Sequence, residues 1–234
     1  MGKRGGNKHV KRLAFPPILR LKTKKGKKWI VKSSPGRHNK ETSVPLLLVI
    51  RDLLGFAKTA REARKIVRKG KVLVDGRVVK DERLPVGIMD VITFKDLDKS
   101  YRLMFDVHGK LIANPIDSEE VSTKVCKVMH KFMMPKGRIG ITLHDGKTLI
   151  ADNSVKVGDS VILELPANKI KSVIKLEPGV HCYVYQGRHI GREAVLEEIK
   201  EVKGAKKQVR MRGDDGEEFY TVLDYIMAVK PASN

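Results

Sequence analysis

The first forty residues of the chain restrict its fold most strongly, because they cannot form a core of their own. They contain 14 Lys and Arg, no Asp or Glu, and several glycines and prolines. Like charges repel one another and few apolar groups are available for burial, so this segment is expected to extend and bind phosphate groups. We predict a basic extension over residues 1–41. Its candidate phosphate-binding residues are Lys3, Arg4, Lys8, His9, Lys11, Arg12, Arg20, Lys22, Lys24, Lys25, Arg37 and His38.

Trp29, the only tryptophan of the chain, lies near the end of this extension. Such a side chain could stack on a nucleic-acid base or anchor the extension to a protein core. Two lysines precede it, whereas Ile30 and Val31 follow it in a strand-like run. The apolar run favours the core anchor, which is our prediction.

The net charge of the whole chain is +21, and it declines along the sequence. The values are +14 in residues 1–40, +5 in 41–104, +2 in 105–174 and 0 in 175–234. Such an excess indicates nucleic acid or an anionic membrane as the partner. The longest apolar run, residues 44–50, contains a proline and is far shorter than the roughly 20 residues of a membrane span. No apolar signal region follows the basic start, so we expect a cytoplasmic protein that binds no membrane.

The cysteine and histidine content gives no sign of a metal or catalytic site. Cys126 and Cys182 form no Cys-x-x-Cys pair, which argues against a zinc ribbon and a disulfide framework. His130 shares a face with Cys126, but two potential ligands do not make a metal site. His108 and His144 stand beside turn residues and are explained by turn chemistry. We predict no metal, no cofactor, no catalytic residue and no small-molecule substrate.

Residues 42–104 predict two short helices followed by strands. The first helix is expected over residues 46–54. Thr59 and Glu62 have the spacing of a capping box, in which each residue satisfies a backbone N–H at the start of a helix. The second helix is therefore expected to begin there and to run to Lys69.

The second helix has two chemically different faces. Ala60, Ala63 and Val67 recur at spacings of three and four and are expected to pack against the domain. Cationic residues occupy the other face and its flanks, where a rigid helix allows several phosphates to be met at once. These candidate phosphate-binding residues are Lys58, Arg61, Arg64, Lys65, Arg68, Lys69 and Lys71.

A valine-rich hairpin follows this helix. Asp75 and Gly76 are typical of a two-residue turn between antiparallel strands. This order of elements, with Gly-Phe-Ala-Lys-Thr-Ala-Arg-Glu-Ala-Arg at 55–64, resembles the S4-type RNA-binding domain. The resemblance implies an RNA-binding domain over residues 42–104. Recognition of shape suits RNA, because its deep, narrow major groove hides the base edges from side chains.

From residue 105 onward, short alternating runs of apolar and polar residues are separated by turns that contain glycine. This pattern is typical of an all-β protein. We predict a central all-β domain over residues 105–174, in which residues 118–121 add at most one helical turn. Its low net charge indicates a spacer or a module that faces other proteins.

The sequence at 178–195 resembles the KOW motif, in which a tight loop joins two strands of a small barrel. Gly187 and Gly191 permit positive φ and close approach of the backbone. The resemblance implies a small SH3-like KOW β-barrel over residues 175–234, with basic loop side chains directed toward phosphate. The candidate phosphate-binding residues of this loop are Arg188 and Arg192.

Taken in order, these parts resemble the archaeal and eukaryotic small-subunit ribosomal proteins of the S4e family over nearly the whole chain. Shorter stretches at 8–13, 34–38, 101–103 and 124–128 also look like that family. The resemblance implies an α+β, multidomain structural protein of the small ribosomal subunit, located in the cytoplasm. Its implied partners are ribosomal RNA and neighbouring ribosomal proteins, and no enzymatic activity is expected.

Two other classes of protein remain as alternatives. An RNA-modifying enzyme would need a large catalytic domain, but the residues after 104 are divided between two small β modules without a Ser/His/Asp set or a P-loop. A translation or transcription factor with a KOW domain would be released from small subunits by high salt. A core ribosomal component would stay bound.

Overall fold

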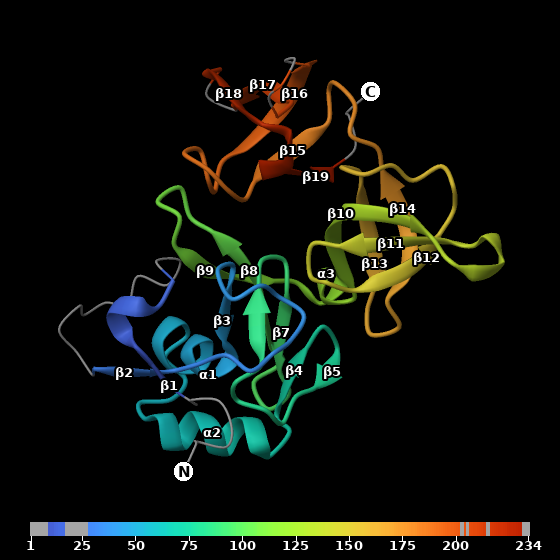
Figure 1. The fold of residues 1–234 in the computed structure, drawn as a ribbon. Helices are drawn as coiled ribbons and strands as arrows, with labels where there is room; N and C mark the ends of the chain where they lie inside the picture. Colours follow the sequence, from blue (N-terminus) through green and yellow to red (C-terminus); the bar gives the residue numbers. More distant parts are fainter. Residues whose placement is uncertain (1–8, 17–27, 202–203, 205, 214–215, 231–234) are drawn as a thin grey trace, which may run out of the picture. The chain divides into compact units, whose positions relative to one another are not determined.

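The structure, a computed structural model, describes residues 9–16, 28–201, 204, 206–213 and 216–230 (Figure 1). The chain is mostly β and divides into two compact units. The first unit comprises Met1–Leu103 and Lys110–Val121, and the second comprises Met104–Gly109 and Ser122–Asn234. Within the described residues, the α-helices all belong to the first unit. The coarse form of the predicted class, helices combined with β-rich domains, is confirmed.

Both predicted helices are present in the first unit. α1, Leu46–Leu48, continues into a π-helical turn, η2, Val49–Leu53. The wider turn arises because the Leu54 N–H donates to the Val49 carbonyl, five residues back. α2, Ala60–Arg68, starts at the predicted capping box and is followed by Gly70, whose φ of +72° ends the helix.

A five-stranded sheet completes this unit. Asp75 and Gly76, with φ values of 51° and 73°, form the predicted two-residue turn between two of its strands. In spatial order the strands are β5 (Arg77–Val78), β4 (Val72–Val74), β7 (Val91–Phe94), β8 (Lys99–Phe105) and β9 (Leu111–Ile116).

The edge strand β9 corrects the predicted boundary at residue 104. It is hydrogen-bonded next to β8, so it belongs to the sheet of the first unit and not to the central β domain. The single helical turn predicted at this point, α3 (Ser118–Val121), ends the first unit. The alternation of apolar and polar residues is the same in both sheets, which is why it did not assign β9 to either one.

Part of the predicted extension is folded. β1 (His9–Lys11) pairs antiparallel with β2 (Trp29–Val31), and a 3-10 turn, η1 (Arg12–Ala14), follows β1. A second two-stranded sheet joins β3 (Ser43–Pro45) to β6 (Pro85–Gly87). The Ser34 N–H donates to the Arg83 carbonyl (2.9 Å), so the extension is attached to the first unit before it reaches residue 41.

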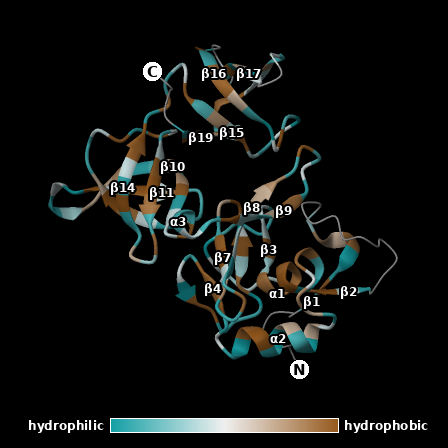
Figure 2. Ribbon diagram, turned by 180° about the vertical axis from the view of Figure 1, so that it is seen from behind, coloured by the Kyte–Doolittle hydropathy of each residue, from teal (hydrophilic) through white to brown (hydrophobic). Residues whose placement is uncertain are grey.

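A five-stranded antiparallel sheet forms the central part of the second unit. Apolar and polar residues alternate along its strands (Figure 2), and its core includes Cys126, Val128, Ile141 and Leu163. A one-turn 3-10 helix, η3 (Pro135–Gly137), connects two of its strands. In spatial order the strands are β12 (Thr148–Ala151), β11 (Ile139–Leu143), β10 (Thr123–Met133), β13 (Ser160–Glu164) and β14 (Lys169–Ile174).

A second five-stranded antiparallel sheet forms the C-terminal part of the same unit. Its core includes Val184, Leu196, Met211 and Ile226. In spatial order the strands are β18 (Glu218–Val222), β17 (Gln208–Gly213), β16 (Glu193–Lys200), β15 (His181–Val184) and β19 (Ile226–Lys230), with a 3-10 turn, η4 (Leu223–Tyr225), before β19.

Buried polar contacts join the two sheets to each other and to the connection 104–109. Lys127 of β10 donates from Nζ to the carbonyls of Leu223 (3.0 Å) and Asp224 (2.8 Å) in η4. The Tyr183 hydroxyl accepts from the Phe105 N–H (2.7 Å) and donates to the Phe105 carbonyl (2.8 Å). These contacts explain why the predicted central and C-terminal domains, together with the connection 104–109, form one compact unit.

Lys127 is expected to make the stability of this unit depend on pH. Burial lowers its pKa to about 8, against the opposing effects of Asp224 and Cys182. In the unfolded chain Lys127 keeps its proton until about pH 10.4. Between about pH 8 and pH 10.4 the unfolded chain therefore binds more protons than the folded chain. The stability difference between the native chain and Lys127→Met should therefore grow by about 1 kcal/mol in favour of the native chain from pH 8 to pH 9. Denaturant titrations of both proteins at the two pH values measure this; an unchanged difference would contradict the low pKa.

The described ranges contain neither a membrane-spanning helix nor a metal-ion site. No helix there has both the length and the apolar content that a bilayer crossing requires. No group of His, Cys, Asp or Glu side chains in the same ranges has the geometry to hold a metal ion. Cys126 and Cys182 are free thiols inside the two cores of the second unit.

Candidate nucleic-acid interface

The capping box makes α2 a rigid support for charged side chains. Thr59 Oγ1 accepts a hydrogen bond from the Glu62 N–H (3.2 Å), and Glu62 Oε2 accepts from the N–H groups of Lys58 (2.9 Å) and Thr59 (3.4 Å). These backbone donors lower the pKa of Glu62, with that of Lys58 contributing most. The first turn is therefore closed without any ligand.

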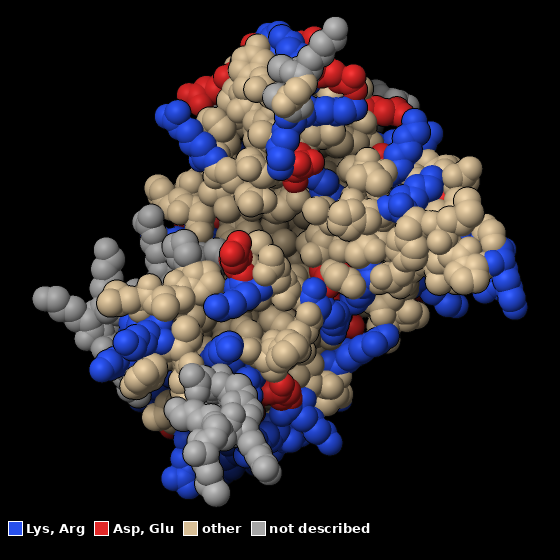
Figure 3. Space-filling model, in the orientation of Figure 1, with Lys and Arg blue, Asp and Glu red and all other residues tan. Residues whose placement is uncertain are grey.

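The helix buries one face and exposes the other, as predicted. Ala63 and Val67 are completely buried, while Ala60 is half-buried. The opposite side carries five cations, and Figure 3 shows Lys and Arg side chains gathered over this end of the first unit. We call this set the α2 surface: Arg61, Arg64, Lys65, Arg68 and Lys69.

Glu82 holds two members of the α2 surface. Arg64 Nε lies 2.9 Å from Glu82 Oε1, and Arg68 Nη2 lies 3.7 Å from the same oxygen. Arg61 and Lys65, by contrast, have no acidic partner among the residues that the structure describes. Exposed cations without counter-charges suit phosphate binding, because the helix backbone already sets their spacing and no ion pair has to be broken.

The two predicted lysines beside α2 have different surroundings. Lys58 is exposed at the start of the helix and donates its backbone N–H to Glu62. Lys71 forms an ion pair with Asp96 of the turn after β7. Lys71 is therefore partly neutralised, and Lys58 remains available at the end of the α2 surface.

Only part of the extension's predicted set can be placed. His9 and Lys11 are exposed on β1, and Arg12 is half-buried in η1. The remaining predicted residues before Trp29 lie outside the described residues. They are Lys3, Arg4, Lys8, Arg20, Lys22, Lys24 and Lys25.

Trp29 is not a core anchor, so this prediction is wrong. Its side chain is 53% exposed, whereas the next residue, Ile30, is only 4% exposed. Successive side chains of a strand point to opposite sides, and the smaller Ile30 takes the buried position. Lys28 Nζ lies 5.8 Å from the centre of the indole ring, and Lys11 is paired with Trp29 across the two strands. The ring is thus an exposed aromatic surface among cations.

Arg37 and His38 attach the extension to the first unit. Arg37 Nη1 lies 2.9 Å from the buried carboxylate of Asp75, at the hairpin turn. His38 is buried, and its Nε2 lies 2.8 Å from Asp90 Oδ2, which also accepts from the Gly87 N–H (2.9 Å). The His38 ring has no surface to offer to phosphate, and we leave it out of the candidate interface.

The two predicted arginines of the C-terminal loop also differ. Arg188 is exposed. Arg192 Nη1 lies 3.2 Å from Glu217 Oε2, and its guanidinium carbon lies 5.9 Å from the centre of the Phe219 ring. Arg192 therefore faces the sheet of its own domain, whereas Arg188 has no acidic partner among the described residues.

Comparison with known proteins identifies the family. The S4 domain model matches residues 46–92, and the model described as Ribosomal family S4e matches residues 97–170. The small ribosomal subunit protein eS4 of Methanocaldococcus jannaschii is 40% identical over 238 residues, which cover 98% of this chain and 96% of that protein. The chain belongs to ribosomal family S4e.

Other S4e proteins agree in sequence and fold. The small ribosomal subunit protein eS4 of Nanoarchaeum equitans is 41% identical over 192 residues, or 82% of each chain. The crystal structure of the 30S ribosomal protein S4e from Thermoplasma acidophilum matches with a TM-score of 0.71 and 34% identity, covering 82% of this chain and 97% of that one.

Two features of this S4e chain were not predicted from its sequence. Lys28, beside Trp29, was not among the predicted residues, although a pair of lysines before an aromatic residue is a signal for exposure. The second feature is a pocket beside α2 in which Phe56 and Leu97 take part. No sequence signal links them, because they come from different elements.

Proposed function

We propose that this S4e chain is a structural component of the small ribosomal subunit that binds ribosomal RNA through the α2 surface and the basic extension. The observation that carries the proposal is the set of exposed cations fixed on a capped helix. The names of the relatives, small ribosomal subunit protein eS4 and 30S ribosomal protein S4e, point the same way. We also propose a cytoplasmic location and neighbouring ribosomal proteins as partners.

The chemistry of the interface is electrostatic. RNA carries closely spaced phosphates, and each cation that neutralises one releases a counterion. Arg61, Lys65 and Arg68 of the α2 surface would contact the backbone of an RNA helix, with Lys58 at one end. Such contacts position the protein and carry little base information.

For the C-terminal part we propose a KOW-type SH3-like barrel. Support comes from the five-stranded antiparallel sheet over residues 181–230 and the 3-10 turn before its last strand. Arg188 is the member of its loop that is free to meet phosphate. The nearly neutral charge of this part favours contacts with neighbouring proteins.

Changing Arg61, Lys65 and Arg68 together to alanine should weaken binding of small-subunit ribosomal RNA by on the order of 10- to 100-fold at about 0.1 M salt. Arg64 is kept because its ion pair with Glu82 ties α2 to the domain. Each lost phosphate contact should also flatten the plot of log affinity against log salt by about 0.7 to 0.9. Filter binding across a salt series measures both effects.

The matched control removes the same charge from a different surface. Lys169, Lys171 and Lys175 are exposed on or beside β14 in the second unit, and their change to alanine should leave affinity and salt slope closer to those of the native chain. Equal losses in the two triple variants would show that net charge matters and the α2 surface does not.

A further inference from the structure

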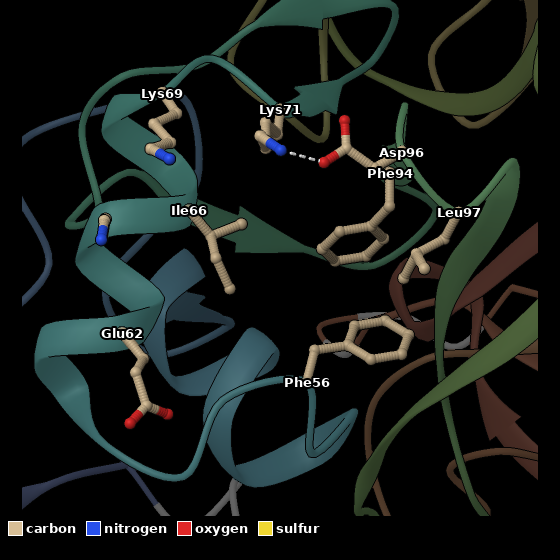
Figure 4. A pocket seen from close by; sticks show the side chains of 9 residues that line it. Phe56, Glu62, Ile66, Lys69, Lys71, Phe94, Asp96 and Leu97 are labelled. Carbon is tan, nitrogen blue, oxygen red and sulfur yellow. Dashed lines mark hydrogen bonds and ion pairs between the residues drawn. The ribbon is translucent and has the colours of Figure 1, made fainter.

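A pocket opens beside the α2 surface. Its volume is about 500 Å³, within the range of known ligand pockets. Figure 4 shows that side chains of α2 and of the turn after β7 face it from two sides, with the Phe56 ring below. The residues that line it are Phe56, Glu62, Lys65, Ile66, Lys69, Lys71, Phe94, Asp96 and Leu97.

The floor of the pocket is apolar and held in place. Phe56 and Phe94 pack edge to face, with ring centres 4.8 Å apart and an angle of 72° between their planes. Tyr101 supports both rings, at 6.1 Å and 6.2 Å. Leu97 is 49% exposed and adds its apolar side chain to the lining of the pocket. The pocket therefore presents flat apolar surface to solvent without needing to rearrange.

The rim of the pocket is cationic. Its two carboxylates are already engaged, since Glu62 closes the capping box and Asp96 pairs with Lys71. Lys65 and Lys69 lie one helical turn apart on α2, and neither has an acidic partner within the described part of the chain. Two ammonium groups thus stand at the mouth of an apolar pocket.

We propose that this pocket receives one unpaired base of the bound RNA, with the flanking phosphates held by Lys65 and Lys69. This inference rests on the proposed function and gives it a specific contact. An unstacked base needs an apolar or aromatic surface, and the phosphates on either side of it need cations. The pocket supplies both, and Lys65 belongs to the pocket and to the α2 surface alike.

An apolar side chain from a neighbouring protein fits these charges less well. It would fill the floor but leave Lys65 and Lys69 without counter-charges at the edge of the contact. Partial desolvation of these two ammonium groups without a counter-charge would then oppose binding, whereas the two phosphates that flank a nucleotide supply the missing negative charge. Charge complementarity therefore favours the nucleotide.

The first experiment locates the base. Full-length protein is bound to transcribed small-subunit ribosomal RNA of Methanocaldococcus jannaschii that contains 4-thiouridine, and the complex is crosslinked with ultraviolet light. We expect a crosslinked peptide that contains Phe56 or Leu97. Crosslinks confined to peptides that do not line the pocket would overturn the inference.

The second experiment measures the contact by a double-mutant cycle. Removal of the crosslinked base from a synthetic fragment of that RNA should weaken binding of the native protein by about 5- to 150-fold. Removal of the same base should weaken RNA binding of Leu97→Ala clearly less, because this variant has already lost part of the contact with the base. Leu97 is half-exposed in a turn, so the change is compatible with folding.

Val78→Ala is the matched control. Val78 is 48% exposed on β5 of the same sheet and does not line the pocket, so the abasic site should cost this variant as much as the native protein. Purely additive effects for Leu97→Ala would overturn the base pocket. If Leu97→Ala binds RNA normally but enters small subunits poorly, a neighbouring protein is the occupant and the inference is also overturned. Failure of the native protein to bind any ribosomal RNA would instead refute the proposed function.

Discussion

Replacing Asp145 by asparagine is expected to lower the free energy of unfolding of the second unit by about 3–5 kcal/mol. Asp145 lies in the turn between β11 and β12, and its Oδ2 is 3.1 Å from Lys124 Nζ and 3.2 Å from Lys147 Nζ. The side chains of Lys124 and Asp145 are 0% exposed. Without the carboxylate, the buried ammonium of Lys124 loses the charge of Asp145, which contributes to offsetting its desolvation.

The same ion pair predicts how stability changes in acid. Burial alone would raise the pKa of Asp145, but the charges of Lys124 and Lys147 outweigh it and hold the pKa well below its usual range. The carboxylate therefore stabilises the fold above the unfolded-state pKa, about 3.9, and this contribution is lost as the pH falls through the lower folded-state value. Asp145→Asn should lack that part of the acid sensitivity.

Hydrogen exchange of the β10 and β11 amides in the full-length chain measures the loss. The control is Glu198→Gln, which removes the partner of Lys200 at 3.5 Å in an ion pair whose glutamate side chain is 53% exposed. Exposed pairs contribute little, so this variant should exchange at nearly the native rate. Equal protection in Asp145→Asn and the native chain would mean that the buried pair does not stabilise the unit.

The features that the sequence predicted correctly are those set by local chemistry. The capping box of Thr59 and Glu62 involves residues three apart, and its hydrogen bonds form as soon as the helix does. The turn at Asp75 and Gly76 is likewise decided by residues that tolerate positive φ. Helix α2, its two faces and the hairpin after it followed from such signals, which also carried the resemblance to the S4 domain.

The features that the sequence did not predict depend on partners far along the chain. His38 is buried next to Asp90, 52 residues later in the chain, and its ring nitrogen lies within hydrogen-bond distance of the Asp90 carboxylate. No residue near His38 in the sequence predicts this contact. Trp29 and Ile30 are successive residues of one short strand and point to opposite sides of it. The sequence pattern therefore allowed either of them to be the buried residue. β9 shares the alternation of the central strands but hydrogen-bonds next to β8. Phe56 and Leu97 line one pocket because the loop before α2 and the turn after β7 lie side by side.

Gly191→Ala should destabilise the second unit by about 2–5 kcal/mol. A Cβ atom at this position would lie 2.4 Å from the carbonyl carbon and oxygen of Asp106 and 2.7 Å from the backbone nitrogen of Val107. Two backbones cannot separate without breaking other contacts, and overpacking of this kind costs about 1–3 kcal/mol. The φ of +84° at Gly191 adds about 1–2 kcal/mol for any residue with a Cβ.

Gly137→Ala separates these two contributions. Gly137 has a similar φ of +69°, but a Cβ there would meet nothing within 4 Å, so only the backbone strain should appear. Urea denaturation of both full-length variants should therefore give a clearly lower free energy of unfolding for Gly191→Ala than for Gly137→Ala. The sequence predicts close backbone approach at this glycine, and the structure shows that the approach is to the chain's own 104–109 connection. Equal stability of the two variants would contradict the packing role of Gly191. If Gly191→Ala is less stable than Gly137→Ala but binds RNA with native affinity and salt dependence, Gly191 acts inside the protein. The phosphate contacts then lie elsewhere.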